Sequence, residues 1–386
     1  MALKIGRGAS APPFLAMDVI ASANARQAAL APGAPPVIRM EVGQPGTGAP
    51  AGAVRAVQAA LSSGASLGYT EAFGLRSLRE RIAAHCADWY GLSLPLPRIA
   101  VTTGASGAFP LAFLAAFDPG DCIALAAPFY PPYVNILTSL GMRPAILPTG
   151  PETRYQPSVA ALDRLDPRPD GLIVASPCNP AGTMLHPEEL AAIAAWCDRE
   201  GVRLISDEIY HGLHYDSPIA TAASFSPHAV VVNSFSKYFS MTGWRVGWLV
   251  LPEELVRPVE CLAQNLFISP PHVSQIAAEA ALDCHAELEA NVARYRRSRD
   301  LLLRALPAAG FPHLSPAEGA FYLYADIGDR TNDSVAFCAR MLDEVGVAAT
   351  PGVDFDRDRG ARTLRFSYCG PEADMAEAAE RLARLR

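Results

Sequence analysis

The sequence predicts an α/β protein with a mostly parallel central sheet and helices on both of its faces, together with a smaller α+β domain. Between residues 50 and 285, short apolar runs alternate with helical stretches. The runs are continuous rather than alternating, as is typical of strands buried on both faces. Of the 386 residues, 50% are hydrophobic and 18% are charged. The chain therefore buries a large core and is not intrinsically disordered.

The N-terminal part is predicted to be an arm followed by a lead-in loop. Residues 1–50 are rich in Pro, Gly and Ala, and only Phe14–Leu30 has a helical pattern. From Gly74 to Tyr90 the apolar residues recur at three- and four-residue steps, which predicts an amphipathic helix that ends at Gly91.

The strands of the central sheet follow in order along the chain. We expect them at Ile99–Thr102, Ile123–Ala126, Ala145–Leu147, Leu172–Ala175, Arg203–Ser206, Val230–Asn233 and Val246–Leu251. A helix is expected at Pro187–Glu200, because it has Pro in its first turn, two Glu beside it, and Gly201 just past its end.

The C-terminal part mixes both kinds of element. A long helical stretch is expected at about Ser274–Leu306. After it we expect a strand at Ala320–Tyr324, a helix at Asp333–Val345, a strand at Thr363–Ser367 and a last helix from Glu372. We predict an N-terminal arm with part of the small domain at 1–45, a large α/β domain at 46–285, and a small α+β domain at 286–386.

Composition excludes several classes of protein. The net charge of −7 argues against nucleic-acid binding. No window reaches the ~18 uninterrupted apolar residues of a membrane span, and Pro12, Pro13 and Asp18 interrupt any secretion signal. The eight cysteines contain no Cys-x-x-Cys pair and lie in apolar stretches, as expected of thiols in a reducing compartment. We therefore expect a cytoplasmic protein that binds neither membranes nor nucleic acid.

Lysine usage points to one residue. Of the 32 basic residues, only Lys4 and Lys237 are lysines. An amine can lose its proton and form a Schiff base, which a guanidinium cannot. The hydroxyls of Ser234 and Ser236 and the guanidinium of Arg245 bracket Lys237 in the sequence. This set suits a phosphate dianion beside a carbonyl that the lysine captures.

Other polar residues follow strands of the same sheet, and in open parallel sheets ligands bind outside the carboxyl ends of the strands. Thr103–Ala108 is either an anion cradle at a helix start or a plain turn. The aromatics of Pro128–Tyr133 either stack on a planar ligand or pack on one another. Asn179 is either a donor to a ligand oxygen or part of a capped turn.

Asp207 ends a strand, and a carboxylate buried there needs a cation such as a protonated ring nitrogen. A competing interpretation makes Glu208, His211 and His214 zinc ligands, but their spacing is not His-Glu-x-x-His, and we expect no metal site. An anion cradle, a stacking ring, an oxygen donor, a carboxylate and an amine together suit one cofactor, pyridoxal 5′-phosphate (PLP).

With these residues, the sequence resembles the class I/II aminotransferases, which are PLP enzymes of fold type I. Ser234–Lys237 with Met241–Gly247 resembles the family's lysine signature. The resemblance covers almost the whole chain, and its further motifs stand in the family's order: Gly43–Gly46, Gly68–Thr70 with Gly74–Arg79, Asn179–Gly182, Asp207–Tyr210 and Arg365–Ser367.

The resemblance implies a role for each of these residues. Lys237 forms the internal aldimine and moves the proton between the substrate α-carbon and the cofactor. Asp207 keeps the pyridine nitrogen protonated, and Arg365 binds the substrate α-carboxylate. The resemblance also implies that Asn179 and Tyr210 contact the phenolic oxygen of the cofactor and that Tyr130 stacks on its ring. The residues implied to hold the phosphate are Ala105, Ser106, Ser234, Ser236 and Arg245. Gly43 and Asn179 are implied to contact the substrate.

Tyr69 is implied to reach the phosphate of a second subunit, so the resemblance predicts a homodimer with shared active sites. The implied reaction transfers an amino group between an L-amino acid and a 2-oxo acid by a ping-pong mechanism. The second arginine of aspartate-specific relatives cannot be placed, and an apolar side-chain pocket of Phe14, Tyr133 and Phe267 is a hypothesis. The alternatives are a C–S β-lyase of the same fold and a non-catalytic PLP-binding module.

Overall fold

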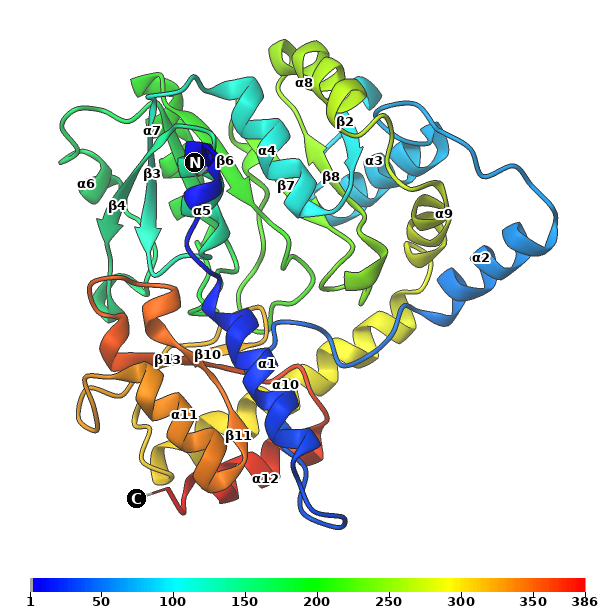
Figure 1. The fold of residues 1–386 in the computed structure, drawn as a ribbon. Coiled ribbons are helices and arrows are strands. Elements are labelled where there is room, and N and C mark those ends of the chain that lie inside the picture. Colours follow the sequence, from blue (N-terminus) through cyan, green and yellow to red (C-terminus); the bar gives the residue numbers. More distant parts are fainter. Residues whose placement is uncertain (1–2, 386) are drawn as a thin grey trace.

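The computed structural model describes residues 3–385, and its centre is a seven-stranded sheet. The strand order is β2-β8-β7-β6-β5-β3-β4. All neighbours are parallel except β8, which runs antiparallel to β2 and β7 (Figure 1). The strands are β2 (Ile99–Thr102), β3 (Cys122–Ala127), β4 (Arg143–Pro148), β5 (Gly171–Ala175), β6 (Arg203–Asp207), β7 (Val230–Ser234) and β8 (Gly247–Val250). The predicted strands are therefore confirmed, with ends within two residues of those expected.

Helices cover both faces of this sheet. On one face, α4, α5 and α8 pack on side chains such as Ile173 and Ile205, and on the other, α3 and α7 pack on Leu172 and Leu204. Successive strand residues thus enter opposite cores, which explains the continuous apolar runs. The helices of this part are α2 (Ala51–Ser62), α3 (Arg76–Tyr90), α4 (Ala105–Ala116), α5 (Pro132–Ser139), α6 (Val159–Leu162), α7 (Pro187–Glu200), α8 (Glu253–Leu266) and α9 (His272–Ala281).

A second, four-stranded sheet has the order β12-β13-β10-β9. Its strands are β9 (His313–Leu314), β10 (Tyr322–Asp326), β12 (Thr350–Pro351) and β13 (Thr363–Ser367), and its helices are α10 (His285–Ala308), α11 (Ser334–Val345) and α12 (Glu372–Leu382). From the N-terminal part, α1 (Leu15–Ala28) contacts α11, and β1 (Ile38–Arg39) pairs in parallel with β11 (Val347–Ala348) (Figure 1). The domain boundaries at 45/46 and 285/286 remain a proposal.

Two expectations were wrong. The single helix at Ser274–Leu306 is interrupted at Leu282–Cys284, because α9 packs against α2 whereas α10 packs against α12. The strand expected from Ala320 begins at Tyr322, since Ala320 has a left-handed φ of 55°, which a strand does not accommodate. Among the helices of residues 3–385, none has the length and apolar character needed to cross a membrane.

Candidate active site

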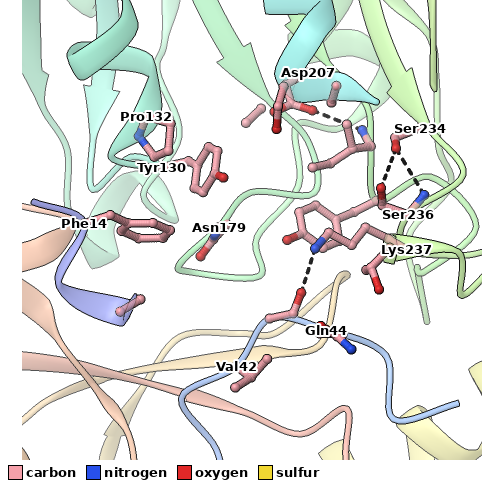
Figure 2. Close-up of a pocket in the computed structure, with 18 of the residues that line it drawn as sticks. Phe14, Val42, Gln44, Tyr130, Pro132, Asn179, Asp207, Ser234, Ser236 and Lys237 are labelled. Carbon is pink, nitrogen blue, oxygen red and sulfur yellow. Dashed lines mark hydrogen bonds between the residues drawn. The ribbon is translucent and has the colours of Figure 1, made fainter. Parts of the chain in front are cut away.

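A cavity of about 670 Å³ opens at the edge of the central sheet where β5, β6 and β7 end (Figure 2). Every site residue that the family resemblance implies, except Tyr69, lines it. These lining residues are Gly43, Ala105, Ser106, Tyr130, Asn179, Asp207, Tyr210, Ser234, Ser236, Lys237, Arg245 and Arg365. Strand ends far apart in the sequence meet here because parallel strands present their carboxyl ends at one edge.

Lys237 follows β7 and points into the cavity. Its Nζ donates a hydrogen bond to the carbonyl oxygen of Gly43 at 2.6 Å (Figure 2). Burial lowers the pKa of Lys237 to about 8, and the positive charges of Arg365 and Arg245 act in the same direction. An amine with this pKa is partly neutral near physiological pH, as a nucleophile or a general base requires.

Asp207 stands at the end of β6 and is buried. The hydroxyl of Tyr133 donates to its Oδ2, and the backbone N–H of Ile209 donates to Oδ1 at 3.1 Å. Burial raises the pKa of Asp207 to about 6, against these two hydrogen bonds and the charge of Lys237. The carboxylate is therefore ionised near pH 7 and suited to pair with a cationic ring nitrogen.

Donors for an anion gather at the start of α4. Arg245 precedes β8, and its Nη2 lies 3.3 Å from Ser106 Oγ in the first turn of α4. Ser234 Oγ lies 2.8 Å from Ser236 Oγ. Gly104 caps the helix with φ 71°, which L side chains rarely adopt, and a Cβ there would lie 2.8 Å from Arg245 Nη2 and displace the guanidinium. Hydroxyls, a guanidinium and a helix N-terminus together favour a phosphate.

Arg365 lies on β13 and is only 2% exposed. Its Nη1 donates to Asn179 Oδ1 at 2.7 Å, and its Nη2 donates to the carbonyl oxygen of Glu41 at 2.5 Å and to Thr350 Oγ1 at 3.1 Å. Its buried Nε has no hydrogen-bond partner within residues 3–385. A buried guanidinium with an unused donor suits a ligand carboxylate.

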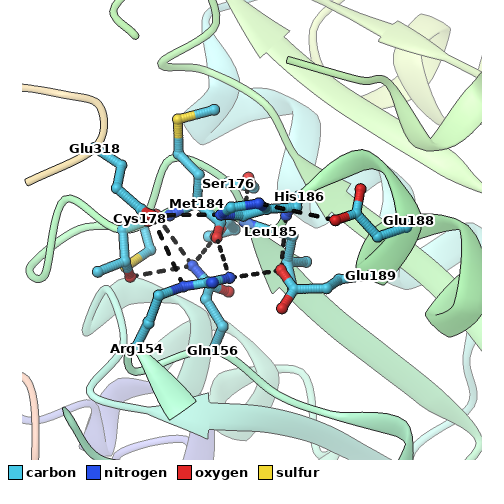
Figure 3. A network of polar contacts seen from close by, with 12 residues as sticks. Arg154, Gln156, Ser176, Cys178, Met184, Leu185, His186, Glu188, Glu189 and Glu318 are labelled. Carbon is cyan, nitrogen blue, oxygen red and sulfur yellow. Dashed lines mark hydrogen bonds and ion pairs between the residues drawn. The ribbon is translucent and has the colours of Figure 1, made fainter. Parts of the chain in front are cut away.

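A polar network holds the loop that carries Asn179 (Figure 3). Within the loop, Leu185 N donates to Ser176 Oγ at 2.9 Å. From outside, Glu318 Oε2 accepts from Met184 N at 2.9 Å, and Gln156 Nε2 donates to the carbonyl oxygen of Thr183 at 3.1 Å. The loop is thus held from both sides, which fixes Asn179 beside Arg365.

Two tyrosines frame the remaining walls. The Tyr130 ring lies edge-on to Phe14 at 5.8 Å and to Tyr133 at 5.4 Å between ring centroids, opposite Lys237 in Figure 2. The Tyr210 ring centroid is 5.6 Å from Lys237 Nζ, and the Tyr210 hydroxyl lies 2.7 Å from that of Tyr322. Tyr322 also lines the cavity and was missed from the sequence, where no motif marks it.

Some residues lie elsewhere. Tyr69 is 83% exposed and outside the cavity, and Phe267 does not line it. Tyr133 lines the cavity but directs its hydroxyl to Asp207 rather than to a side-chain pocket.

His211, one of the residues considered as a zinc ligand, forms a hydrogen bond with the Tyr90 hydroxyl at 2.7 Å. No group of three or more His, Cys, Asp or Glu within residues 3–385 is placed to hold a metal ion.

The donors present fit PLP. The cavity lies in the size range of small-molecule sites. It offers a phosphate cradle around Arg245, a buried carboxylate for the ring nitrogen at Asp207, and an amine at Lys237 for the aldehyde. These groups on this fold define a PLP-dependent enzyme of fold type I.

The chain belongs to the family "Aminotransferase class I and II", whose sequence model matches residues 35–382. It is 48% identical over 383 residues to the valine–pyruvate aminotransferase of Mycobacterium tuberculosis, covering 98% of this chain and 97% of the relative. The crystal structure of an aminotransferase from Mycobacterium tuberculosis superposes with a TM-score of 0.96, at 47% identity, covering 99% of this chain and 98% of that one.

The aspartate aminotransferase of Thermus thermophilus with maleate superposes with a TM-score of 0.92 at 31% identity, covering 100% of both chains. The protein is therefore a PLP-dependent aminotransferase that transfers an amino group between an amino acid and a 2-oxo acid. All three of these relatives are named as aminotransferases, which favours this activity over a C–S β-lyase or a non-catalytic module.

Proposed function

We propose that this aminotransferase takes the amino group from an apolar L-amino acid and gives it to pyruvate or a similarly short 2-oxo acid. The observation that carries the proposal is the composition of the cavity wall. Phe14, Met17 and Ile20 of the α1 region and Ile136 of α5 supply apolar lining. The relative from Mycobacterium tuberculosis, which is named for valine and pyruvate, supports the same substrate class.

The charges of the lining argue against a dicarboxylic substrate. The cationic lining residues within 3–385 are Lys237, Arg245 and Arg365. We assign each of them another role, so none remains for a distal carboxylate. Placing that carboxylate against an apolar wall without a partner is costly, whereas each buried CH₂ of an aliphatic side chain contributes about 0.8 kcal/mol.

A substrate panel tests this proposal. Purified enzyme is given valine, leucine, phenylalanine, alanine, aspartate or arginine, with pyruvate or 2-oxoglutarate as acceptor, and kcat/KM is measured from product formation. Valine should exceed alanine by about tenfold, because its side chain buries two more carbon groups. Aspartate should be a poorer substrate than either of them. A preference for aspartate or arginine would contradict the proposed substrate class.

We propose the following division of labour for the side chains. When bound, PLP supplies an electron sink for the electron pair released as the substrate loses its α-proton. Arg365 binds the α-carboxylate and so orients the α-hydrogen toward Lys237. Lys237 would take that proton on Nζ and then give it to the cofactor. Asp207 holds the proton on the ring nitrogen, and Asn179 and Tyr210 donate to the cofactor's phenolic oxygen.

We also propose a homodimer in which Tyr69 reaches the phosphate of the partner's site. Tyr69 is 83% exposed, and Leu266, Phe267 and Ile268 at the end of α8 are 51%, 37% and 51% exposed. Ser269 Oγ accepts from Thr70 N at 3.3 Å, which joins the two segments. Ile268 has φ 65°, a strained conformation for a β-branched residue. Exposed apolar side chains on two joined segments, one of them with local strain, support an interface.

Subunit mixing tests the shared site. Lys237→Ala and Tyr69→Ala enzymes, each with little activity, are unfolded together and refolded. In the mixed dimer one site has both defects and the other has neither. Random mixing should restore about a quarter of wild-type activity, because half of the dimers are mixed and each has one intact site.

The matched control mixes Lys237→Ala with Asp207→Asn. These residues come from the same chain in every site, so each mixed site keeps one defect and activity should not return. Equal recovery in both mixtures, or a fully active monomer at nanomolar concentration, would contradict the shared site.

A cytoplasmic location is proposed as well, since all eight cysteines are free thiols and five of them are buried.

A further inference from the structure

Tyr322 touches several functional groups of the cavity at once. It is the first residue of β10, paired with Ser367 of β13, and is only 1% exposed. Its hydroxyl lies 2.7 Å from the hydroxyl of Tyr210, and the Arg365 guanidinium lies 4.5 Å from its ring centroid. A Cβ at Gly43 would lie 2.1 Å from the Tyr322 hydroxyl oxygen. The ring therefore fills the space between the Gly43 backbone and Arg365.

The contact between the two hydroxyls has a definite direction if Tyr210 donates to the cofactor. A phenol has one proton, so it donates one hydrogen bond and accepts others. When the Tyr210 proton points to a cofactor oxygen, the Tyr210 oxygen must accept from Tyr322. The two hydroxyls then form a chain in which each bond polarises and strengthens the next.

The ring of Tyr322 has a separate task. Phe355 lies on Arg365 as well, with 4.8 Å from the guanidinium carbon to the ring centroid. The two aromatic contacts, together with the hydrogen bonds to Asn179 and Glu41, fix the plane of the guanidinium. A planar carboxylate needs a guanidinium held in one plane to form paired hydrogen bonds.

We propose that Tyr322 is a positioning residue for this aminotransferase. Its hydroxyl directs the Tyr210 proton toward the cofactor, and its ring holds the Arg365 guanidinium in the plane that receives the substrate carboxylate. This inference rests on the proposed roles of Tyr210 and Arg365. The hydroxyl and the ring of Tyr322 thus have separate effects. The hydroxyl affects the cofactor through Tyr210, and the ring affects substrate binding through Arg365.

Two substitutions separate these properties. Tyr322→Phe keeps the ring and removes the hydroxyl. The KM for the amino acid should stay within about twofold of the wild type, while kcat falls about three- to tenfold, the effect of one hydrogen bond. Tyr322→Leu also removes the ring, so the KM should rise about tenfold as well, because the cation–π contact is lost.

A spectroscopic measurement tests the role of the Tyr322 hydroxyl independently of enzyme turnover. Because Tyr210 becomes a weaker donor to an anionic oxygen in Tyr322→Phe, the pH at which the bound cofactor changes colour should rise relative to the wild type. Tyr210→Phe should raise it too. In the Tyr210→Phe background, Tyr322→Phe should add little, since the two hydroxyls act as one unit. Additive shifts would overturn the proposal.

Tyr324→Phe is the matched control. Tyr324 lies two residues along β10, is 1% exposed, and bonds through its hydroxyl to Thr363 Oγ1 at 2.7 Å, outside the cavity. The Tyr324→Phe variant loses a comparable buried hydrogen bond, so its thermal stability should fall while KM, kcat and the pH of the colour change stay unchanged. Equal effects of Tyr324→Phe and Tyr322→Phe on the colour change, or no effect of Tyr322→Phe, would overturn the positioning role. Failure of the proposed substrate class appears separately, in the wild-type panel.

Discussion

Replacement of Asp207 by asparagine should leave the cofactor bound but reduce turnover by about 100- to 5000-fold. Removing one partner of a buried ion pair typically costs about 3–5 kcal/mol, which corresponds to this range. The amide cannot keep a proton on the ring nitrogen, so the electron sink is weakened. Single-turnover kinetics with a good amino-acid donor, together with the cofactor content of the variant, measure the effect.

The control is Glu208→Gln, the adjacent buried carboxyl. Glu208 Oε1 accepts from Ser206 Oγ at 2.9 Å and from Ala222 N at 2.8 Å, and the residue does not line the cavity. This variant should lose stability rather than turnover. Near-normal turnover of Asp207→Asn would show that the ring nitrogen does not depend on this carboxylate.

Replacement of Lys237 by arginine should abolish measurable turnover. The positive charge is retained, but a guanidinium does not deprotonate and so neither captures the aldehyde nor carries the α-proton. Loss of the proton transfer alone is expected to reduce the rate by about 100- to 10,000-fold. Lys4→Arg is the control, because Lys4 is exposed and does not line the cavity.

The pKa of Lys237 predicts that the rate of PLP capture depends on pH. That pKa is lowered to about 8, so the amine is charged below this pH and neutral above it. Capture of PLP by the cofactor-free enzyme should therefore accelerate as the pH rises from 6 to about 8 and then level off. A rate that falls over this interval would mean that another group limits the capture.

Much of the site was predictable because its residues follow strands that are recognisable by themselves. The runs ending at Thr102, Ala175 and Ser206 are apolar on both faces, so their positions do not depend on distant parts of the chain. Once the strands are placed, the edge at which parallel strands end brings Asn179 and Asp207 together.

Other features depend on contacts between distant segments and leave no local signal. Tyr322 lies near Arg365 because β10 pairs with β13. Its hydroxyl lies near that of Tyr210 because the four-stranded sheet approaches the end of β6 in the central sheet. Tyr133 reaches Asp207 because α5 starts at Pro132, in a stretch that reads as an aromatic loop. The break between α9 and α10 contains neither Gly nor Pro, and the different packing partners of the two helices produce it.

If Lys237 binds the cofactor, reduction with borohydride should fix PLP covalently on that residue. Enzyme loaded with PLP is reduced with borohydride and digested, and the modified peptide is identified by mass spectrometry. The chain has only Lys4 and Lys237 as lysine targets, so the assignment is clear. We expect one phosphopyridoxyl group per chain, on Lys237. Attachment at Lys4, or no attachment at all, would contradict it.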